Sequence, residues 1–334
     1  MQTRATLEDV ARAAGVSRAT ASRAVRGGEF VSAANLAAVR KAVKDLGYVP
    51  NPAARSLVTR QTDTIAVVVP EHDARIFSDP FIASAIAGVA EALEETPKQL
   101  VLLMRSRRHG SQRMTAYLEG GHIDGTVVVS HHRGDQLPQV IARAGLAAAF
   151  IGRPFDADAG TAFVDLDNAA GGRMAAEHLI GAGARRIATV TGPLDMEAAL
   201  DRLVGWSAAL QDAGMDDSMR YEGDFTLQTA EAIGVRLITE HPEVDAVFAA
   251  NDLTAVGIIN ALRAAGRRVP EDVRVIGFDD SPLCLGTHPQ LTSLTNPAKE
   301  LAHAATGMVL DQLAHRPVAS PVILQPRLVV RASA

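Results

Sequence analysis

The feature that most limits the possible folds is a series of short apolar runs, which recur from residue 64 to residue 280. These runs cover residues 64–70, 99–104, 125–130, 147–152, 186–192, 245–250 and 273–280. Helix-length segments lie between them, among them 81–96, 169–183, 226–241 and 252–266. Buried strands that alternate with helices are typical of parallel sheets covered on both faces. We therefore predict an α/β fold, with two sheets if residues 163–168 and 291–297 cross between two lobes.

Polar side chains follow two of these runs at the point where the predicted strand ends. Asn251 comes directly after 245–250, and Asp279 lies at the end of 273–280. Open α/β sheets bind ligands at the carboxyl ends of their strands. Asp and Asn accept hydrogen bonds from sugar hydroxyls, and Arg donates them. Two further candidates are Arg202, in "RLVGW", and Phe225, in "EGDFT", since an aromatic face packs on the apolar side of a sugar ring.

Several neighbouring residues have a structural interpretation instead. We expect Asp252 to be a helix N-cap, because Asp is favoured there, and Asp280 to be structural as well. The pair His131–His132 has no second histidine cluster near it in the sequence and is expected in a solvated loop. The glycines of "GAGARR", 181–186, fall at the end of a predicted helix, so we interpret them as a C-cap rather than a dinucleotide-binding loop.

The amino-terminal end of the chain differs from the rest in charge. Residues 1–60 carry ten Lys or Arg and four Asp or Glu, a net charge of +6, in a chain whose net charge is −5. The remainder therefore carries −11. A basic module on an acidic body indicates a polyanionic partner.

Residues 6–26 contain the pattern of two short helices joined by a glycine turn. Thr6 can cap the first helix with Asp9 as its capping-box partner, Gly15 permits the turn, and Ser17 can cap the second helix. On the second helix small apolar residues face inward, while the outward row is Arg18, Ala19, Ser22, Arg23 and Arg26. This pattern predicts a helix-turn-helix whose second helix can enter a DNA major groove.

Two further helices are expected before the apolar runs begin. Ser32 can cap a third helix that Gly47 closes. In "YVPNPAARSL", Asn51 is a good N-cap and Pro52 occupies the first helical position. The resulting helix has only six or seven residues and should form only when something holds it, because helix nucleation is costly.

The stretches "TLEDVARAAGVSRATASRAV" and "VSAANLAAVRKAVKDLGYVPNPAARSL", together with the domain that follows, resemble the LacI/GalR family of bacterial transcription repressors. The stretches "LVTRQTDTIAVVVPE", "IFSDPF", "VTGPLDM" and "EGDFT" are most similar to actinobacterial regulators of cello-oligosaccharide use. The resemblance implies a helix-turn-helix headpiece and a core of two doubly wound lobes, similar to periplasmic sugar-binding proteins, with a ligand cleft between them. It also implies a homodimer that binds a pseudo-palindromic operator.

The resemblance assigns roles to individual residues. Those that would contact DNA are Thr6, Ser17, Arg18, Ala19, Thr20, Ser22, Arg23, Arg26, Asn51, Ala54 and Leu57. Leu57 would be a wedge in the minor groove, where an apolar side chain unstacks a base step and kinks the duplex. The residues that would hold the sugar by this resemblance are Arg202, Phe225, Asn251 and Asp279. The segments after two strands of the N-lobe add Phe77, Asp79, Phe81 and Arg153, although Phe77 and Phe81 could be core residues, with one of them lining the cleft. Arg26 stands where the family usually has asparagine, and "RGGEF" also departs from the family, which leaves the operator sequence open.

The resemblance also suggests bounds for the domains. We expect a headpiece over 1–49, a hinge helix and linker over 50–61, and an effector-binding and dimerisation domain over 62–334. Within it the N-lobe would take about 62–165 and 296–322, and the C-lobe about 166–295 and 323–334. Nothing near the carboxyl end offers the heptads of a tetramerisation helix, so a dimer is expected.

Other classes of function fit less well. The sequence has no catalytic Ser/His/Asp set and no metal-ligand spacing, and its single cysteine, Cys284, excludes an intramolecular disulfide, so we expect no enzyme activity, cofactor or metal. It has no signal-peptide pattern and no membrane-length apolar run, so we expect a cytoplasmic protein. A solute-binding protein would not use residues 1–60, and a nucleotide-dependent enzyme would need a glycine loop after a strand. A purine- or monosaccharide-responsive regulator that acts by corepression stays open.

Overall fold

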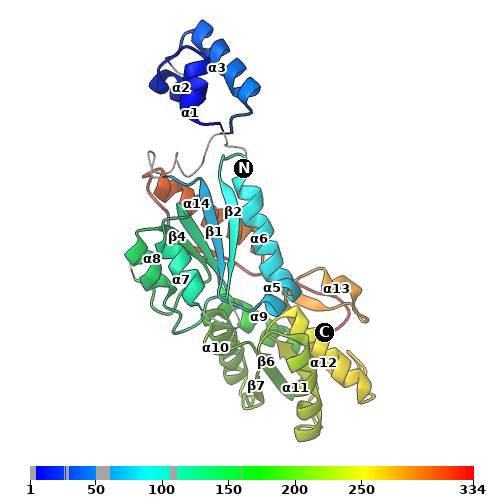
Figure 1. Cartoon of the computed structure of the whole chain (residues 1–334). Coiled ribbons are helices and arrows are strands. Elements are labelled where there is room, and N and C mark those ends of the chain that lie inside the picture. Colours follow the sequence, from blue (N-terminus) through cyan, green and yellow to red (C-terminus); the bar gives the residue numbers. More distant parts are fainter. Residues whose placement is uncertain (1–4, 26, 28–29, 50–60, 106–110, 159) are drawn as a thin grey trace. The chain divides into compact units, whose positions relative to one another are not determined.

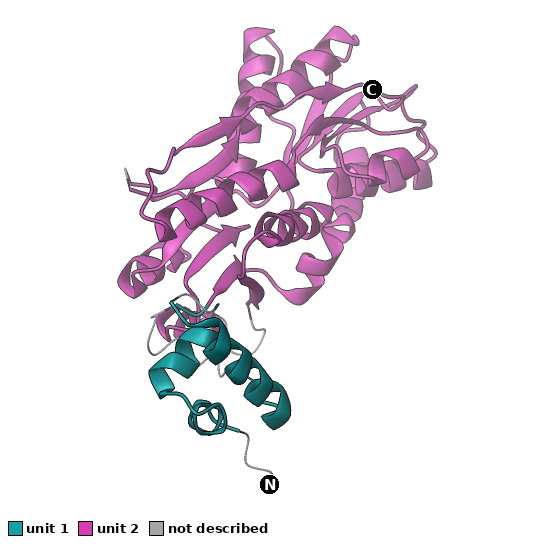
Figure 2. Cartoon of the chain, turned by 90° about the horizontal axis from the view of Figure 1, so that it is seen from above, with its two compact units in different colours: residues 1–62 teal, residues 63–334 magenta. Residues whose placement is uncertain are grey.

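The computed structural model describes residues 5–25, 27, 30–49, 61–105, 111–158 and 160–334 (Figure 1). The chain divides into two compact units (Figure 2), residues 1–62, here called the headpiece unit, and residues 63–334, here called the core unit. The predicted hinge-helix residues Asn51, Ala54 and Leu57, and also Arg26, lie outside the described residues.

The headpiece unit has three described helices, α1 (Leu7–Ala13), α2 (Arg18–Val25) and α3 (Ala33–Leu46). Each pair of these helices is in contact. Their shared core consists of small and β-branched side chains, namely Val10, Ala11, Ala21, Ala24, Val39 and Ala42. Side chains of this size allow three short helices to approach closely around one centre.

Local capping explains where the first two helices begin. The Thr6 hydroxyl accepts a hydrogen bond from the Asp9 backbone N–H at 3.3 Å, and the Asp9 carboxylate accepts one from the Thr6 N–H at 3.0 Å. Gly15, at φ +66°, takes the left-handed conformation of the turn. The Ser17 hydroxyl accepts a hydrogen bond from the Thr20 N–H at 3.1 Å. The predicted helix-turn-helix is thus confirmed.

The first sheet of the core unit is parallel and has the spatial order β11-β5-β4-β3-β1-β2. Its strands are β1 (Thr64–Val69), β2 (Gln99–Met104), β3 (Gly125–Val129), β4 (Ala147–Ile151), β5 (Phe163–Leu166) and β11 (Val322–Leu324). One face packs on α6 (Pro80–Leu93) and α14 (Ala298–Leu313). The other face packs on α7 (Gln112–Glu119) and α8 (Leu137–Ala144). A short helix, α5 (Asp73–Ser78), follows β1.

The second sheet has the order β12-β10-β9-β8-β6-β7. Its strands are β6 (Ile187–Thr191), β7 (Arg220–Glu222), β8 (Ala246–Ala249), β9 (Arg274–Asp279), β10 (Thr292–Thr295) and β12 (Leu328–Val329). One face packs on α11 (Leu227–Glu240) and α12 (Asp252–Ala264), and the other on α9 (Asn168–Gly181) and α10 (Glu197–Asp212). A four-residue helix, α13 (Leu283–Gly286), follows β9.

The apolar alternation within a strand explains why both faces are covered. In β1, Ile65, Val67 and Val69 belong to the cluster with α6 and α14, while Ala66 and Val68 belong to the cluster with α7 and α8. Successive side chains of a strand point to opposite faces, so a strand that is apolar throughout needs helices on both sides. The predicted α/β fold with two covered sheets is confirmed.

The chain crosses between the two sheets at residues 166–168, 295–298 and 324–328. The first two crossings lie where the sequence pattern placed them. One short pairing departs from the parallel arrangement, because β12 pairs antiparallel with β10. β12 is a two-residue strand at a sheet edge, where the chain returns from β11, and such a strand can pair in either direction.

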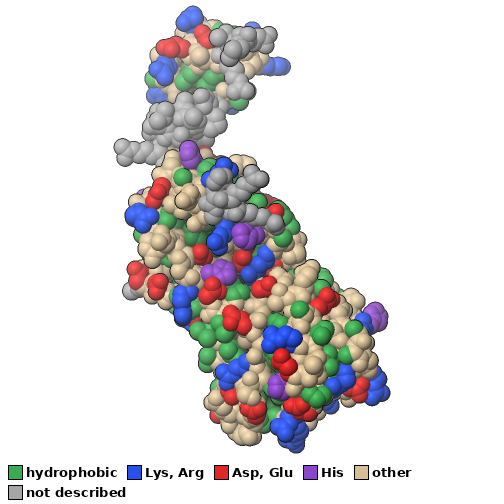
Figure 3. All heavy atoms as spheres, turned by 60° about the horizontal axis from the view of Figure 1, so that its bottom comes forward, with side chains coloured by type: hydrophobic (Ala, Val, Ile, Leu, Met, Phe, Trp, Pro, Cys, Tyr) green, Lys and Arg blue, Asp and Glu red, His purple; other side chains and the backbone are tan. Residues whose placement is uncertain are grey.

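Charged side chains of both signs are interspersed over the face of the chain seen in Figure 3. On that face the acidic side chains of the core unit do not gather into one patch. None of the helices in the described ranges combines the length and the apolar character that a membrane span requires.

Candidate functional site

The exposed side of α2 is the first candidate surface. The capping bond of Ser17 and the inward packing of Ala21 and Ala24 fix which residues of α2 face outward. Seven of the residues predicted to contact DNA are described by the structure. Exposed side chains are those of Thr6, Ser17, Arg18, Ala19 and Arg23, and half-buried ones are those of Thr20 and Ser22. An exposed row with arginine at both ends and small residues between them has the shape and charge that a DNA groove admits.

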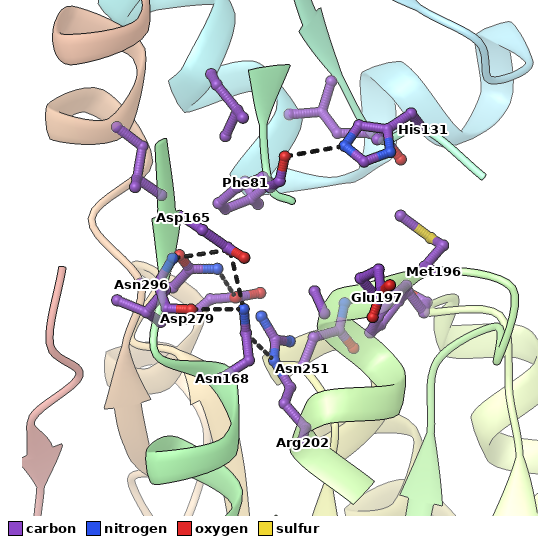
Figure 4. Close-up of a pocket in the computed structure, with 18 of the residues that line it drawn as sticks. Phe81, His131, Asp165, Asn168, Met196, Glu197, Arg202, Asn251, Asp279 and Asn296 are labelled. Atoms are coloured by element: carbon purple, nitrogen blue, oxygen red, sulfur yellow. Dashed lines mark hydrogen bonds between the residues drawn. The ribbon is translucent and has the colours of Figure 1, made fainter. Parts of the chain in front are cut away.

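The second candidate is a pocket in the core unit at the carboxyl ends of the strands of both sheets (Figure 4). About 700 Å³ of space lies between its lining residues, and this figure includes space open to solvent. Phe81 and His131 reach it from the lobe of the first sheet, and Arg202 and Asn251 from the lobe of the second (Figure 4). Seven of the eight predicted ligand residues line it, namely Asp79, Phe81, Arg153, Arg202, Phe225, Asn251 and Asp279.

Phe77 is the exception, since the structure places Phe81 and not Phe77 at the pocket. Its side chain is 73% exposed and does not line the pocket. Ile76, the residue before it on the short helix α5, is 1% exposed and takes the inward position. Successive helical residues point about 100° apart, so Phe77 faces away from the core.

Arg202 forms the floor of the pocket. Its Nε donates to the Asn168 Oδ1 at 2.9 Å, its Nη1 donates to the Ala250 carbonyl at 2.5 Å, and its guanidinium lies 3.7 Å from the centre of the Phe278 ring. Burial lowers the pKa of Arg202, and the carboxylate of Asp279 opposes this effect. A guanidinium held this firmly presents its donors in a fixed geometry to a ligand.

Asp279 lies beside this floor in an unusual backbone conformation, with φ +110°. Its carboxyl group accepts a hydrogen bond from the Asn296 Nδ2 at 2.9 Å. Burial raises the pKa of Asp279 well above its ordinary value, although the charge of Arg202 acts in the opposite direction. Two other pocket residues, Ser130 and Phe225, also have positive φ, +59° and +63°. Such residues persist where the surrounding structure holds them, and they are concentrated at binding sites.

Asn251 and Phe225 are linked to each other. The Asn251 Oδ1 accepts a hydrogen bond from the Thr254 N–H at 2.9 Å, so Asn251 is the N-cap of α12. Its Nδ2 donates to the Phe225 carbonyl at 3.2 Å. The expected N-cap role of Asp252 was therefore wrong: that carboxylate instead accepts bonds from Ser293 Oγ at 2.6 Å and Ser281 N at 2.7 Å.

The other lobe contributes acidic and aromatic residues. Asp79 caps α6 by accepting a hydrogen bond from the Phe81 N–H at 2.9 Å, and burial raises the pKa of Asp79. Asp165, at the end of β5, accepts hydrogen bonds from the Arg153 N–H at 3.2 Å and the Asn168 Nδ2 at 3.1 Å. Burial raises the pKa of Asp165 to about 6.

The side chain of Arg153 extends from its own lobe across the cleft to the other lobe. Its guanidinium pairs with Glu197 at 2.9 Å and Asp201 at 2.8 Å, both on α10 of the opposite lobe. A second contact joins the same lobes, because His132 bonds Asp195 of the second lobe at 2.9 Å while its other ring nitrogen bonds Glu71 of its own lobe at 2.8 Å. Residues 195–201 are therefore held by two sets of charged groups from the first lobe.

The expectation of a solvated loop for His131–His132 was wrong. His131 is 8% exposed, packs edge-on against Phe150 and donates from Nε2 to the Gly152 carbonyl at 3.1 Å. Burial lowers the pKa of His131 to about 4. The apolar run that precedes the pair ends at residue 130, so the strand-end rule applied to 251 and 279 would also have indicated this position.

Sequence reasoning missed several residues that line the pocket, namely Arg75, Ser130, His131, Asp165, Asn168, Met196, Glu197 and Asn296. The rule that polar residues at strand ends line the pocket would also have indicated Asp165 and Asn168, since they lie where β5 ends and the chain crosses to the second lobe. Met196 and Glu197 carried no such signal. Within the described residues no group of three or more His, Cys, Asp or Glu side chains is placed to hold a metal ion.

Comparison with known proteins places this geometry in context. Residues 6–51 match the model of bacterial regulatory proteins of the lacI family, and residues 176–334 match a periplasmic binding protein-like domain. The HTH-type transcriptional regulator CelR of Thermobifida fusca is 44% identical over 335 residues, which cover 99% of this chain and 98% of that protein.

Two solved structures have the same architecture. A structure described as a transcriptional regulator CelR–cellobiose complex matches with a TM-score of 0.79 and 41% identity, over 99% of this chain and 100% of that one. The lac repressor dimer bound to operator and the anti-inducer ONPF matches with a TM-score of 0.86 and 25% identity, over 99% of each chain. With a headpiece match, a core match and a 44% identical relative along nearly its whole length, this chain belongs to the lacI family of bacterial regulatory proteins.

Proposed function

We propose that the chain is a transcriptional repressor that binds operator DNA as a homodimer and releases it when a neutral sugar such as cellobiose fills the pocket of the core unit. The observation that carries the proposal is the convergence of buried Arg202 and Asn251 with half-buried Asp279 beside Phe225, between two lobes. These groups donate to hydroxyls, accept from hydroxyls and offer an apolar face.

The charge balance of the pocket favours a neutral ligand over a phosphorylated one. Three guanidinium groups line it, from Arg75, Arg153 and Arg202, and four carboxyl groups, from Asp79, Asp165, Glu197 and Asp279. A phosphate would need a surplus of positive charge.

Similarity supports a cello-oligosaccharide as the ligand. A 41% identical regulator has been solved as a complex with cellobiose. Of the eight ligand-binding residues proposed from the sequence, we retain the seven that line the pocket and leave out Phe77.

On the DNA side, we assign base and phosphate contacts to α2, with Arg18 and Ala19 as the main specificity positions. The full set is Thr6, Ser17, Arg18, Ala19, Thr20, Ser22, Arg23 and Arg26, with Asn51, Ala54 and Leu57 in a hinge over 50–61. Two recognition helices reach successive major grooves only in a dimer, which supports the homodimer. A protein that acts on operator DNA works in the cytoplasm.

A calorimetric titration of the purified chain with a ligand panel tests the sugar assignment. The panel holds cellobiose, cellotriose, ribose, galactose and a purine base. Cellobiose or cellotriose should bind most tightly. Binding of ribose, galactose or the purine alone would reject the oligosaccharide assignment, and a chain that binds sugar but no DNA would be a solute-binding protein.

A further inference from the structure

The guanidinium group of Arg75, on α5, is only partly hydrogen-bonded by its own lobe. Its Nη1 pairs with the Glu71 Oε1 at 2.8 Å, and its side chain is 14% exposed. Among the residues that the structure describes, the acceptor for its Nη2 is the Met196 sulfur at 4.0 Å, and a thioether sulfur accepts hydrogen bonds weakly. Its Nε is buried and has no hydrogen-bond partner within the same described residues. One edge of the guanidinium is therefore anchored, and the rest lacks a good acceptor.

This guanidinium lies close to Phe225, the aromatic residue of the site. Its central carbon lies 5.3 Å from the centre of the Phe225 ring, and the residue lines the pocket. Phe225 itself is fixed, since its backbone carbonyl accepts from Asn251 and its ring packs against the backbone of Gly192. A sugar that packs on Phe225 would therefore lie close to Arg75.

Glu71 holds the anchored edge in place. The same Glu71 oxygen accepts hydrogen bonds from Ser130 Oγ at 2.9 Å and from His132 Nε2 at 2.8 Å. An oxygen that binds three donors cannot move far, so Arg75 can pivot about its Glu71 contact without leaving the pocket.

We propose that Arg75 is a specificity-determining residue of the pocket, whose Nε and Nη2 donate hydrogen bonds to one hydroxyl or ether oxygen of the sugar that packs on Phe225. The ligand oxygen replaces the weak contact with the Met196 sulfur and satisfies the buried Nε. This inference rests on the proposed function, because it names the group that recognises the sugar. It predicts that the site rejects sugars that lack an oxygen at this one position.

The test combines Arg75→Met with a series of monodeoxy cellobioses, in calorimetric titrations of the full chain. Methionine keeps much of the length and removes the donors. For the parent chain, one deoxy sugar should bind about 10- to 100-fold more weakly than cellobiose, as expected for loss of a charged hydrogen bond. Arg75→Met should bind cellobiose more weakly by a similar factor and should show no further loss with that deoxy sugar.

The matched control is Arg133→Met, because Arg133 also lies over an aromatic ring, that of Phe155 at 4.0 Å, but does not line the pocket. It should bind every sugar as the parent does. Arg75→Lys keeps a cation beside Glu71 without the Nε donor and should repeat the Arg75→Met pattern, which covers the case in which Arg75→Met fails to fold.

Two results would overturn the proposal. One is binding of cellobiose by the Arg75 variants within twofold of the parent. The other is an equal loss for all sugars, which would mean that Arg75 only supports the structure around Glu71. Cellobiose binding by the parent chain checks the proposed function separately, since it does not involve the variants.

Discussion

His131 and His132 are adjacent in the sequence, yet their pKa values shift in opposite directions. Burial lowers the pKa of His131 to about 4. Burial would also lower the pKa of His132, but the hydrogen bonds and charges of Glu71 and Asp195 outweigh it and raise this pKa above its ordinary value. Each of the two ring nitrogens of His132 faces a carboxylate, an arrangement that the imidazolium form satisfies completely.

A pH-dependent stability contribution follows for His132. Because its folded pKa is raised, the contribution is fully present below the ordinary pKa of about 6.5 and is lost as pH rises through the folded value. We expect His132→Gln to lower the free energy of unfolding by about 1 kcal/mol at pH 6 and by much less at pH 9. Urea unfolding of parent and variant at both pH values measures this.

The comparison between parent and variant removes the effect of other titrating groups, such as Asp165 with its pKa of about 6. His303→Gln is the control, since His303 pairs with Glu91 at 3.6 Å and the two side chains are 50% and 42% exposed. A His132→Gln penalty that is equal at pH 6 and pH 9 would show that packing, not charge, is what His132 contributes.

At the scale of elements, the close approach of α9 and α10 positions the floor of the pocket. A Cβ at Gly205 of α10 would overlap the Ala169 carbonyl oxygen of α9, and a Cβ at Gly172 of α9 would overlap the Arg202 carbonyl oxygen. The Arg202–Asn168 hydrogen bond at 2.9 Å spans the same two helices. The two glycines thus set the distance at which this bond forms.

Gly205→Ala should therefore affect both stability and binding. We expect a loss of about 1–3 kcal/mol in the free energy of unfolding, because overpacking pushes the helices apart. Cellobiose binding should weaken by about tenfold or more, because Arg202 and Asn168 separate. The control is Gly181→Ala, at the end of α9, where an added Cβ meets nothing within 4 Å. If Gly205→Ala binds cellobiose as the parent does, helix spacing does not position Arg202.

The recognition helix α2 supports a prediction that separates two kinds of contact. Arg23→Ala should weaken operator binding by about 1–3 kcal/mol. Arg18→Ala should instead change which operator sequence is preferred, since arginine reads guanine in the major groove. Titrations of an operator set at one salt concentration distinguish them. A uniform loss for Arg18→Ala across all operators would mean that Arg18 contacts phosphate only.

At the scale of the whole molecule, sugar binding in the core unit must influence the headpiece unit through a shift between arrangements of the two lobes. The charged contacts of Arg153 and His132 join the lobes on one side of the pocket. A ligand that contacts both lobes favours one arrangement by its difference in affinity for the two.

We expect cellobiose to lower operator affinity by about 1–3 kcal/mol, and the operator to lower cellobiose affinity by the same factor, as linkage requires. Operator titrations with and without cellobiose, at one salt concentration, measure the first effect, and calorimetry with and without operator measures the second. Asp279→Asn should bind operator like the parent and lose the response to sugar, because an amide NH2 replaces one of the two carboxyl oxygens that can accept hydrogen bonds from sugar hydroxyls.

If Asp279→Asn releases the operator at the parent's cellobiose concentration, Asp279 does not hold the sugar. If cellobiose instead tightens operator binding, the pocket assignment can stand while induction is replaced by corepression.

The sequence by itself determined the features that depend on neighbours within a few residues. The capping of α1 and α2 by Thr6 and Ser17, the glycine turn, and the alternation of buried strands with helices all follow from local hydrogen bonding and side-chain periodicity. The strand-end rule then placed Asn251 and Asp279 in the pocket, because the carboxyl ends of parallel strands meet at one edge of a sheet.

Only the tertiary structure decided which distant groups meet. His132 lies 61 and 63 residues from the carboxylates of Glu71 and Asp195 that it bonds, and Arg153 pairs across the cleft with α10. Ile76 and Phe77 are both large apolar residues, so the sequence does not show which of them is buried. The packing of α5 against the core determines that Ile76 faces inward. Contacts of this kind depend on how segments far apart in the chain, and the two lobes, approach each other, which no local pattern in the chain encodes.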